Sequence, residues 1–457
     1  MVAPAELEFD EGTLLLGPPG LEPERVPQGF VRDPRAGGRY RARGVSYREA
    51  LLHLRTGGLT DAARAYEALE LKHRGTRKPY PHQAEALDAW WGAGGRGVVV
   101  LPTGAGKSHV AELIMQRVQR ATLVVVPTVD LLVQWQRGLS LAFGEPVGML
   151  GGGSNDVRPI TITTYDSAYL HMHRIGNRFG LVVFDEVHHL PASAYSQAAE
   201  MCIAPFRLGL TATPERTDGL HLRLDTLVGP EVYRRQITEL TGEYLAEYDT
   251  CVLPVPLTAE ERVRYDEADR VYRAFIARNR IRLGAPDGWQ RFLQLASRSA
   301  EGRAAHLAWR ERRRVSQASE GKLQVLGELF AAHAESKVVV FTNDNRTIYE
   351  ISRRFLIPVI THETPARERL AILSGIESGR YRIVGTSRVL NEGVDMPDVA
   401  VAIVVSGTGS VREAVQRLGR ILRRREGKQA VLYELVADGT SEDHTSDRRR
   451  NHEAFAT

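Results

Sequence analysis

The feature that most restricts the fold of this chain is a series of short apolar runs, rich in β-branched residues, that alternate with helical patterns. Buried parallel strands have such continuous apolar runs, and helices between them give the order of a doubly wound sheet. The strands expected in a first series are 97–101, 123–126, 160–163, 181–184 and 207–210, and those in a second series are 338–341, 358–360, 382–384, 401–405 and 430–435. The pattern therefore predicts two α/β domains.

The rest of the 457-residue chain is divided around these two domains. Glycine and proline punctuate its first part, and a helix-like stretch follows at 47–54, so we expect a small, partly irregular accessory domain there. The expected divisions are an accessory domain at 1–74, α/β domains at 75–245 and 321–436, a helical insert at 246–320 and a flexible tail at 437–457.

Positive charge is concentrated in the expected insert. Residues 262–314 contain fourteen arginines, no lysine and six acidic residues, although the whole chain has a formal net charge of only +4. Such a stretch is typical of a phosphate-binding surface, but a solvated helical surface has the same composition. Composition does not separate the two. We take Arg278, Arg280 and Arg282 as the candidate phosphate contacts of the insert.

Several classes of protein are excluded by composition. The chain has two cysteines, Cys202 and Cys251, which excludes a disulfide framework and a cysteine-rich metal site. No apolar run approaches the roughly 18 residues that a membrane span requires, and the first residues lack the features of a secretory signal. We therefore expect a cytoplasmic protein without a membrane partner, and a monomer.

A glycine-rich loop follows the expected strand 97–101 and leads into a helix that should start near Ser108. Backbone N–H groups in such a loop point toward phosphate oxygens, Lys107 can reach the β- and γ-phosphates, and the Ser108 hydroxyl can bind Mg²⁺. Leu101 stands where the general motif has its first glycine. The candidate ATP-binding residues of the loop are Thr103, Gly104, Ala105, Gly106, Lys107 and Ser108.

The expected strand 181–184 ends in two carboxylates. Asp185 is placed to hold Mg²⁺, partly through water, and Glu186 to orient and deprotonate the attacking water. His188 and His189 follow directly, but adjacent side chains point in different directions and no third metal ligand is near in sequence. We therefore favour a role in coupling the nucleotide site to a nucleic-acid strand site over a metal site.

Four ordered motifs resemble those of superfamily 2 helicases. They lie at 185–191, 210–216, 385–395 and 416–423, and they are most similar to the XPB branch, which includes archaeal and bacterial repair helicases and a eukaryotic subunit of transcription and excision repair. The resemblance covers roughly residues 75–436. It implies two RecA-like domains that share one ATP site, with an insert between them that is often called a thumb.

The resemblance also implies roles for residues outside the phosphate loop. Arg420 and Arg423 would reach the γ-phosphate, and in a helix they would share a face with Gln416, at i, i+4 and i+7. Residues expected beside the nucleotide are Tyr80, Gln83, which would read adenine, Gly393 and Asp395. Residues expected to couple hydrolysis to movement are His188, His189, Thr211, Thr213 and Gln416, and those expected to follow one nucleic-acid strand are Thr128, Thr164, Thr342, Asn343 and Thr386.

Two features depart from the family pattern. Several members carry an Arg-Glu-Asp triplet linked to unwinding, whereas this chain has Arg216-Thr217-Asp218, so strand separation is less secure than ATP hydrolysis. The first 74 residues cannot be matched residue by residue to the damage-recognition domain of larger members, and their role stays open.

The favoured hypothesis is an ATP-dependent, nucleic-acid-stimulated motor that moves 3′ to 5′ and unwinds or remodels DNA in repair, at single strands and duplex junctions. One alternative is a duplex translocase that does not separate strands and serves a partner nuclease or repair factor. Another is a nucleotide-gated clamp. Lys107, Glu186 and Arg420 argue against the clamp, because a clamp without turnover has no use for a water-activating carboxylate.

Overall fold

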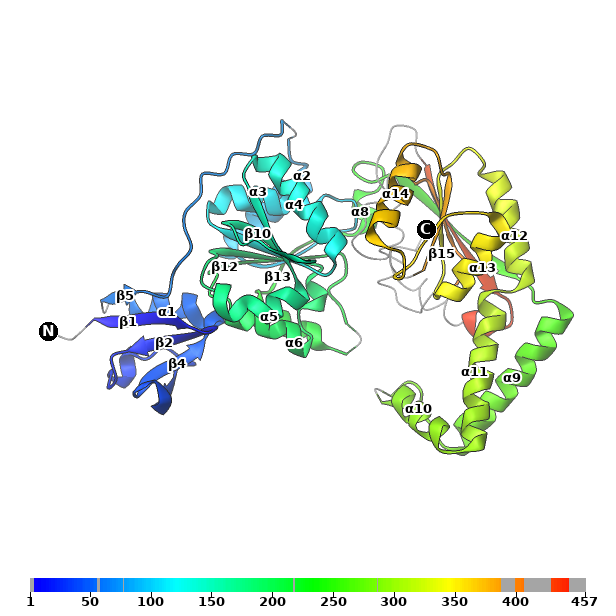
Figure 1. The fold of residues 1–457 in the computed structure, drawn as a ribbon, viewed down its shortest axis with the longest axis horizontal. Coiled ribbons are helices and arrows are strands. Elements are labelled where there is room, and N and C mark those ends of the chain that lie inside the picture. Colours follow the sequence, from blue (N-terminus) through cyan, green and yellow to red (C-terminus); the bar gives the residue numbers. More distant parts are fainter. Residues whose placement is uncertain are drawn as a thin grey trace. The chain divides into compact units, whose positions relative to one another are not determined.

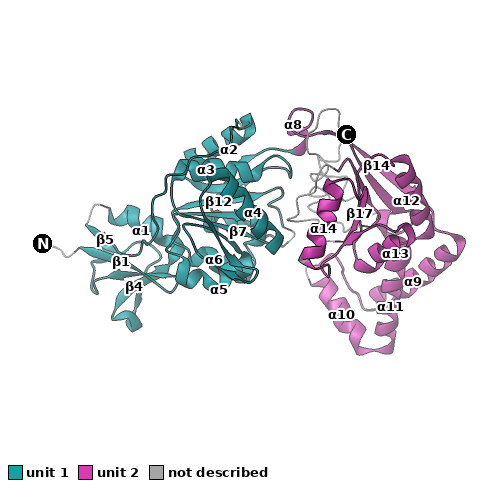
Figure 2. Cartoon of the chain, turned by 45° about the horizontal axis from the view of Figure 1, so that its top comes forward, with its two compact units in different colours: residues 1–236 teal, residues 237–457 magenta. Residues whose placement is uncertain are grey.

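The computed structural model describes residues 4–55, 58–76, 78–216, 218–285, 287–387, 399–406 and 429–443. These residues form three β-sheets, of five, eight and six strands. The chain divides into two compact units, residues 1–236 and 237–457 (Figure 2). The first unit holds the five- and eight-stranded sheets, and the second holds the six-stranded sheet.

The eight-stranded sheet has the order β13-β6-β12-β11-β7-β10-β8-β9, and all its strands are parallel except the edge strand β9. Its strands are β6 (Arg96–Val100), β7 (Thr122–Val126), β8 (Val147–Gly151), β9 (Ser154–Asn155), β10 (Ile160–Thr164), β11 (Leu181–Asp185), β12 (Phe206–Thr211) and β13 (Glu231–Arg234). The five strands expected from the apolar runs are all present. Their side chains are almost entirely buried, which explains why the runs are continuous.

Helices cover both faces of this sheet, as in a doubly wound fold. Helices α2, α3 and α4 lie on one face, and α5 and α6 lie on the other (Figure 1). Their bounds are α2 (Pro81–Gly92), α3 (Lys107–Val118), α4 (Val129–Phe143), α5 (Tyr165–Ile175) and α6 (Ser193–Met201), and the short α7 (Leu224–Leu227) follows β12. Two caps use threonine: Thr128 accepts a hydrogen bond from Leu131 N, and Thr164 accepts one from Ser167 N.

The accessory region, expected to be partly irregular, contains a sheet that the sequence did not predict. Its order is β3-β4-β2-β1-β5, and its elements are β1 (Ala5–Asp10), β2 (Thr13–Gly17), β3 (Val31–Asp33), β4 (Arg39–Arg43), α1 (Tyr47–Leu54) and β5 (Leu59–Asp61). The helix agrees with the expected stretch at 47–54. The strands were missed because charged residues alternate along them and pair across the sheet, as Arg39 does with Glu8 at 2.7 Å.

The accessory sheet and the eight-stranded sheet share one hydrophobic core. Leu7, Leu14 and Leu16 belong to the same buried cluster as Met172 and Cys202. Gly44 approaches α6 so closely that a Cβ atom there would lie 2.6 Å from the carbonyl oxygen of Met201. The accessory region is therefore packed onto the first α/β domain.

The six-stranded sheet has the order β14-β19-β18-β15-β17-β16, and every neighbouring pair is parallel. Its strands are β14 (Glu247–Val255), β15 (Val338–Phe341), β16 (Val359–Ile360), β17 (Ile383–Thr386), β18 (Val401–Val404) and β19 (Gln429–Ala437). Strand β14 corrects the start of the insert, which was expected at 246. It was missed because Glu247 and Asp249 make its first half polar and Pro254 interrupts its apolar second half.

Some helices of the second unit accompany this sheet, and others form the insert. They are α8 (Ile237–Leu240), α9 (Ala259–Arg278), α10 (Gly288–Arg298), α11 (Ala300–Gln317), α12 (Glu320–Ala332), α13 (Asn345–Phe355) and α14 (Ala366–Glu377). Helices α9 to α11 pack around their own small core, which includes Tyr272, Phe275 and Phe292. Within the described ranges, no helix is both long enough and apolar enough to cross a membrane.

The prediction of a flexible tail at 437–457 is wrong for residues 438–443. Nζ of the buried Lys322 lies 2.6 Å from Oε2 of Glu442 and donates to the carbonyl oxygen of Val405 at 2.7 Å. Ser441 N donates to the Tyr265 hydroxyl at 2.8 Å. A buried ammonium needs such partners, so residues 438–443 are held against the second domain. Residues 444–457 lie outside the described part.

Candidate nucleotide site and motor motifs

Adjacent parallel strands bring the nucleotide motifs together. In the sheet, β12 lies between β6 and β11, so the ends of these three strands are neighbours. Lys107 follows β6 through the glycine-rich loop, Thr211 ends β12 and Asp185 ends β11. The carboxyl edge of an open parallel sheet is the usual place for a ligand. The nucleotide residues expected in the first domain therefore gather at one edge.

The phosphate loop has the backbone that its glycines predict. Gly104 and Gly106 have φ angles of +90° and +83°, in the left-handed region that favours glycine. Lys107 begins α3, and its Nζ donates to the carbonyl oxygen of Leu101 at 3.3 Å. Oγ1 of Thr103 is buried and has no hydrogen-bond partner among the described residues. A phosphate oxygen would satisfy this hydroxyl, so the loop fits the group that the sequence predicts.

Gln83 lies directly under this loop. Its Nε2 donates to the carbonyl oxygen of Ala105 at 3.0 Å, and its Oε1 accepts from Tyr80 N at 2.9 Å. His82 Nε2 lies 2.9 Å from the same Ala105 oxygen. A Cβ atom on Gly106 would come within 2.2 Å of Gln83 Nε2. In this structure the Gln83 amide supports the loop, while adenine recognition by Gln83 stays a prediction.

The Asp185 carboxylate is held from both sides. Trp135 Nε1 donates to its Oδ2 at 2.8 Å, and Glu186 N donates to its Oδ1 at 3.0 Å. Burial raises the pKa of Asp185 above its usual range and the charge of Glu186 adds to the rise, whereas Lys107 and the Trp135 hydrogen bond oppose it. A divalent cation beside Asp185 would stabilise the ionised form, so this carboxylate fits a Mg²⁺ site.

Glu186 connects the site to the third motif. Its φ of +47° lies in the left-handed region, which costs about 1 kcal/mol or more and is typical of functional sites. Glu186 Oε2 lies 3.5 Å from both Thr211 Oγ1 and His188 Nδ1, and these two atoms are 3.1 Å apart. Thr211 Oγ1 also accepts from Thr213 N at 3.2 Å. The expected coupling residues of the first domain thus form one hydrogen-bonded group, apart from His189.

The His189 ring is tilted by 36° against that of His188, and the two ring centroids are 4.4 Å apart. Within the described residues, no group of three potential metal ligands includes either histidine. Arg216 extends the coupling group, because its Nη1 donates to the carbonyl oxygen of His188 at 2.7 Å. Arg216 also forms a two-point ion pair with Asp218. Thr217, between them, lies outside the described residues.

Comparisons with known proteins agree with this geometry. The family described as ERCC3/RAD25/XPB C-terminal helicase matches residues 307–453, and the family described as type III restriction enzyme, res subunit, matches 76–216. A relative from Sulfurisphaera tokodaii, "DNA 3'-5' translocase XPB2", is 42% identical over 418 residues, which are 86% of this chain and 95% of the relative. The chain belongs to the XPB helicase family. A third family match, to the XPB damage recognition domain, covers residues 7–61.

Two further comparisons concern a bacterial relative and a solved structure. "DNA 3'-5' helicase XPB" of Mycobacterium tuberculosis is 31% identical over 81% of this chain, and the chain spans 62% of that relative's length. The solved Pyrococcus furiosus Hef helicase domain has 17% identity and a TM-score of 0.53, covering 80% of this chain and 97% of its own. That structure supports the fold alone, which has two RecA-like domains. The match at 7–61 shows that the accessory sheet, which sequence reasoning left unassigned, is similar to the XPB damage recognition domain.

The residues expected to follow a nucleic-acid strand are divided between the units of this XPB-family chain. In the first, Thr128 and Thr164 cap helices after the neighbouring strands β7 and β10. In the second, Thr342 and Thr386 are fully buried, and their hydroxyls donate to the carbonyl oxygens of Asp344 and Ile360, both at 3.0 Å. Nucleic-acid contact by these residues stays a prediction.

Other expected site residues lie in the second unit or outside the described residues. Asn343 is buried, and its N donates to Ser406 Oγ at 3.0 Å. Arg278 pairs with Glu301 at 2.9 Å, whereas neither Arg280 nor Arg282 forms an ion pair within the described ranges. The residues that lie outside these ranges are Gly393, Asp395, Gln416, Arg420 and Arg423.

Sequence reasoning missed the residues that support the site from behind. Trp135 contacts Asp185, and His82 contacts Ala105. The Tyr165 hydroxyl donates to the carbonyl oxygen of Asp185 at 3.0 Å. Helical periodicity could have placed Trp135 on the buried face of its helix. It could not have identified the carboxylate 50 positions away in the chain that this side chain meets.

Proposed function

We propose that this chain is an ATP-driven DNA motor of the XPB family that moves 3′ to 5′ and acts in DNA repair. The observation that carries the proposal is the convergence of Lys107, Asp185 and Glu186 at neighbouring strand ends. A cation for the phosphates, a carboxylate for the metal and a carboxylate for water are the parts that nucleoside triphosphate hydrolysis requires. The names of the archaeal and mycobacterial relatives support DNA as the track and the polarity of movement.

In the proposed reaction Lys107 holds the β- and γ-phosphates against the loop, whose backbone N–H groups face the same oxygens. Mg²⁺, when bound by Ser108 and by Asp185 partly through water, supplies positive charge beside the transferred phosphoryl group. Glu186 orients the attacking water and accepts its proton. Trp135 keeps the Asp185 carboxylate in a fixed orientation through its 2.8 Å hydrogen bond.

Coupling to movement begins at Glu186. Because its carboxylate lies 3.5 Å from both His188 and Thr211, a change of charge at Glu186 alters the hydrogen bonds of both side chains. Arg216, which binds the His188 carbonyl, carries that change to the segment after β12. This group connects the reacting centre to the neighbouring strand ends, where Thr128 and Thr164 are proposed to contact the DNA backbone.

The second domain is proposed to complete the site. Arg420 and Arg423 would neutralise charge on the γ-phosphoryl oxygens when the domains close, with Gly393 and Asp395 beside the nucleotide. Hydrolysis would then occur only in the closed state. The division into an accessory domain, two motor domains and a thumb-like insert is part of the same proposal.

A second candidate is a duplex translocase that does not separate strands. Thr217 replaces the glutamate of a triplet associated with unwinding, and the archaeal relative is itself named a translocase rather than a helicase. Such a motor would serve a partner nuclease or repair factor. The two candidates share the ATP site and differ in what movement does to the duplex.

The deciding experiment measures ATP hydrolysis with and without DNA, beside two assays of movement. Forks with 3′ and 5′ overhangs, with matched RNA controls, report strand separation, and displacement of a third strand from a triplex reports translocation. DNA-stimulated hydrolysis with separation of 3′ forks is the expected result. Triplex displacement without fork separation would select the translocase. Nucleotide-dependent DNA binding without turnover would overturn both in favour of a clamp.

A further inference from the structure

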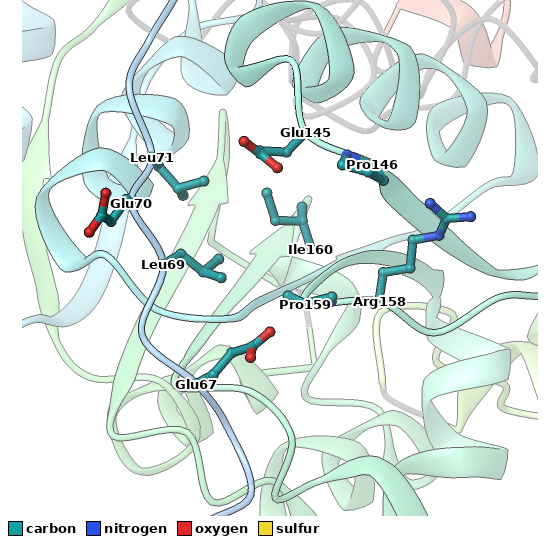
Figure 3. Close-up of a pocket in the computed structure, with 9 residues that line it drawn as sticks. All are labelled: Glu67, Leu69, Glu70, Leu71, Glu145, Pro146, Arg158, Pro159 and Ile160. Atoms are coloured by element: carbon teal, nitrogen blue, oxygen red, sulfur yellow. The ribbon is translucent and has the colours of Figure 1, made fainter.

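The linker between the accessory sheet and α2 is held along its length by the first motor domain. Leu69 N donates to the carbonyl oxygen of Gln119 at 2.9 Å, and Arg74 N donates to that of Ala142 at 2.7 Å. Leu69 and Leu71 form part of one wall of a cavity of about 560 Å³ at the start of β8 and β10 (Figure 3). These bonds fix the position of His73, which follows in the linker.

Three potential metal ligands meet where this linker passes α3. His73 Nε2 lies 3.0 Å from Glu112 Oε2, and His109 Nδ1 lies 2.9 Å from the same oxygen. The three side chains are only 14–16% exposed, and their ligand atoms all lie within 4.8 Å of one another. His109 and Glu112 are three positions apart on one helix, so the helix sets their spacing. His73 closes the group from the linker.

The geometry of the group is close to that of a coordination shell. Zinc binds imidazole nitrogen and carboxylate oxygen at about 2.0–2.2 Å, so ligand atoms around a tetrahedral ion are roughly 3.3 Å apart. The two nitrogen–oxygen separations, 2.9 and 3.0 Å, would need to open by only about 0.3–0.4 Å, and the two nitrogens lie within 4.8 Å of each other.

We propose that His73, His109 and Glu112 bind a zinc-class divalent cation that joins the linker to α3. Two imidazoles and one carboxylate suit zinc, cobalt or nickel, whereas magnesium prefers oxygen ligands. The site is therefore distinct from the Mg²⁺ site assigned to Ser108 and Asp185. Since α3 begins at Lys107, the ion ties the linker of the accessory domain to the helix that carries the phosphate-binding lysine.

The test uses the full chain without an added histidine tag and without nucleotide. Cobalt is titrated while its visible d–d absorption is followed, and zinc affinity is then measured by competition with a chromophoric chelator. One saturable equivalent per chain is expected. Mutation of a residue that only hydrogen-bonds to a metal ligand typically lowers metal affinity about 10–100-fold. Loss of a ligand itself should cost no less, so His73→Gln and Glu112→Gln should each weaken binding at least tenfold.

The matched control replaces His171 and His173 on α5, which removes two histidines outside the group. This control should bind as the wild type does. Zinc should also raise the melting temperature of the wild type and of the control, because an ion that binds the native state and not the unfolded state stabilises the native state. The melting temperatures of the two ligand variants should not rise. Thermal melting in EDTA establishes whether each variant is folded. If Glu112→Gln does not fold, His73→Gln, whose substitution lies in the linker, still tests the proposal. Absence of a one-equivalent site, or unchanged cobalt affinity in a folded ligand variant, would overturn the proposal.

Discussion

The indole Nε1 of Trp135 donates a 2.8 Å hydrogen bond to Oδ2 of Asp185, across 50 positions of sequence. The bond orients a buried carboxylate that is proposed to hold Mg²⁺. It belongs to the tertiary structure, because β11 places the carboxylate at the strand end and α4 brings the indole over it.

Replacing this indole should weaken the metal site without unfolding the domain. Trp135→Phe keeps an aromatic ring in the buried position and removes only the donor. We expect the Mg²⁺ concentration for half-maximal ATP hydrolysis to rise by about tenfold, as for other partners of metal ligands. The matched control is Trp90→Phe, because Trp90 Nε1 makes a buried 2.9 Å bond to the carbonyl oxygen of Arg207, remote from the carboxylates. Equal Mg²⁺ dependence in both variants would contradict this role of Trp135.

The two halves of the phosphate site should give different defects. Lys107→Ala should weaken nucleotide binding, whereas Glu186→Gln should bind ATP, lose hydrolysis by on the order of a hundredfold or more and remain closed on the strand. Equilibrium nucleotide binding and steady-state hydrolysis separate the two. Glu261→Gln is the control, since Glu261 is similarly buried but caps α9. A Glu186→Gln protein that hydrolyses ATP at the wild-type rate would refute the proposed base.

Arg420→Ala should leave ATP binding nearly intact and abolish DNA-stimulated turnover. A finger arginine contributes roughly a thousandfold or more in rate, whereas an exposed ion pair, for example with Glu413 or Glu426, contributes at most about 1 kcal/mol to stability. Arg425→Ala removes a nearby positive charge outside the motif and should retain activity. The measurements are single-turnover hydrolysis and thermal unfolding. A lowered melting temperature with normal hydrolysis would exclude a shared site.

The arginines of the insert can be tested as phosphate contacts. Replacing Arg278, Arg280 and Arg282 together by alanine should weaken binding to all DNA sequences and flatten its salt dependence, by about 0.9 in log–log slope for each phosphate that is no longer neutralised. The control replaces Arg264, Arg273 and Arg314, which each lie within 4 Å of an acidic side chain of the insert. Among the three test residues only Arg278 has such a partner within the described ranges. Fluorescence anisotropy over a range of salt gives both quantities. Identical slopes in the two triple variants would favour a solvated surface.

The first residues after β19 should stabilise the second domain. A chain that ends after Ala437 loses Glu442 and leaves the buried Lys322 ammonium without its carboxylate. Breaking a buried ion pair costs about 3–5 kcal/mol, so this chain should unfold at a clearly lower temperature than one that ends after Asp443. Calorimetry of the two truncated chains makes the comparison. Coincident unfolding would mean that this ion pair contributes little.

The local features of this protein could be read from its sequence. The five buried strands of the first sheet, the phosphate loop and the acid pair at Asp185 and Glu186 lie where they were expected. Strands buried on both faces have continuous apolar runs, and the glycine-rich loop has left-handed backbone at Gly104 and Gly106. These properties depend on neighbouring residues alone, so no knowledge of distant contacts was needed.

Tertiary structure decided the features whose cause lies elsewhere in the chain. The accessory strands and β14 have alternating or charged sequences, and their identity as strands comes from partners across a sheet. Glu442 was expected in a flexible tail, but the buried Lys322, 120 positions earlier, holds it in place. Gln83 supports the phosphate loop because packing leaves its amide facing Ala105. Side-chain partners at such distances are set by how elements pack, and periodicity along one segment contains no record of them.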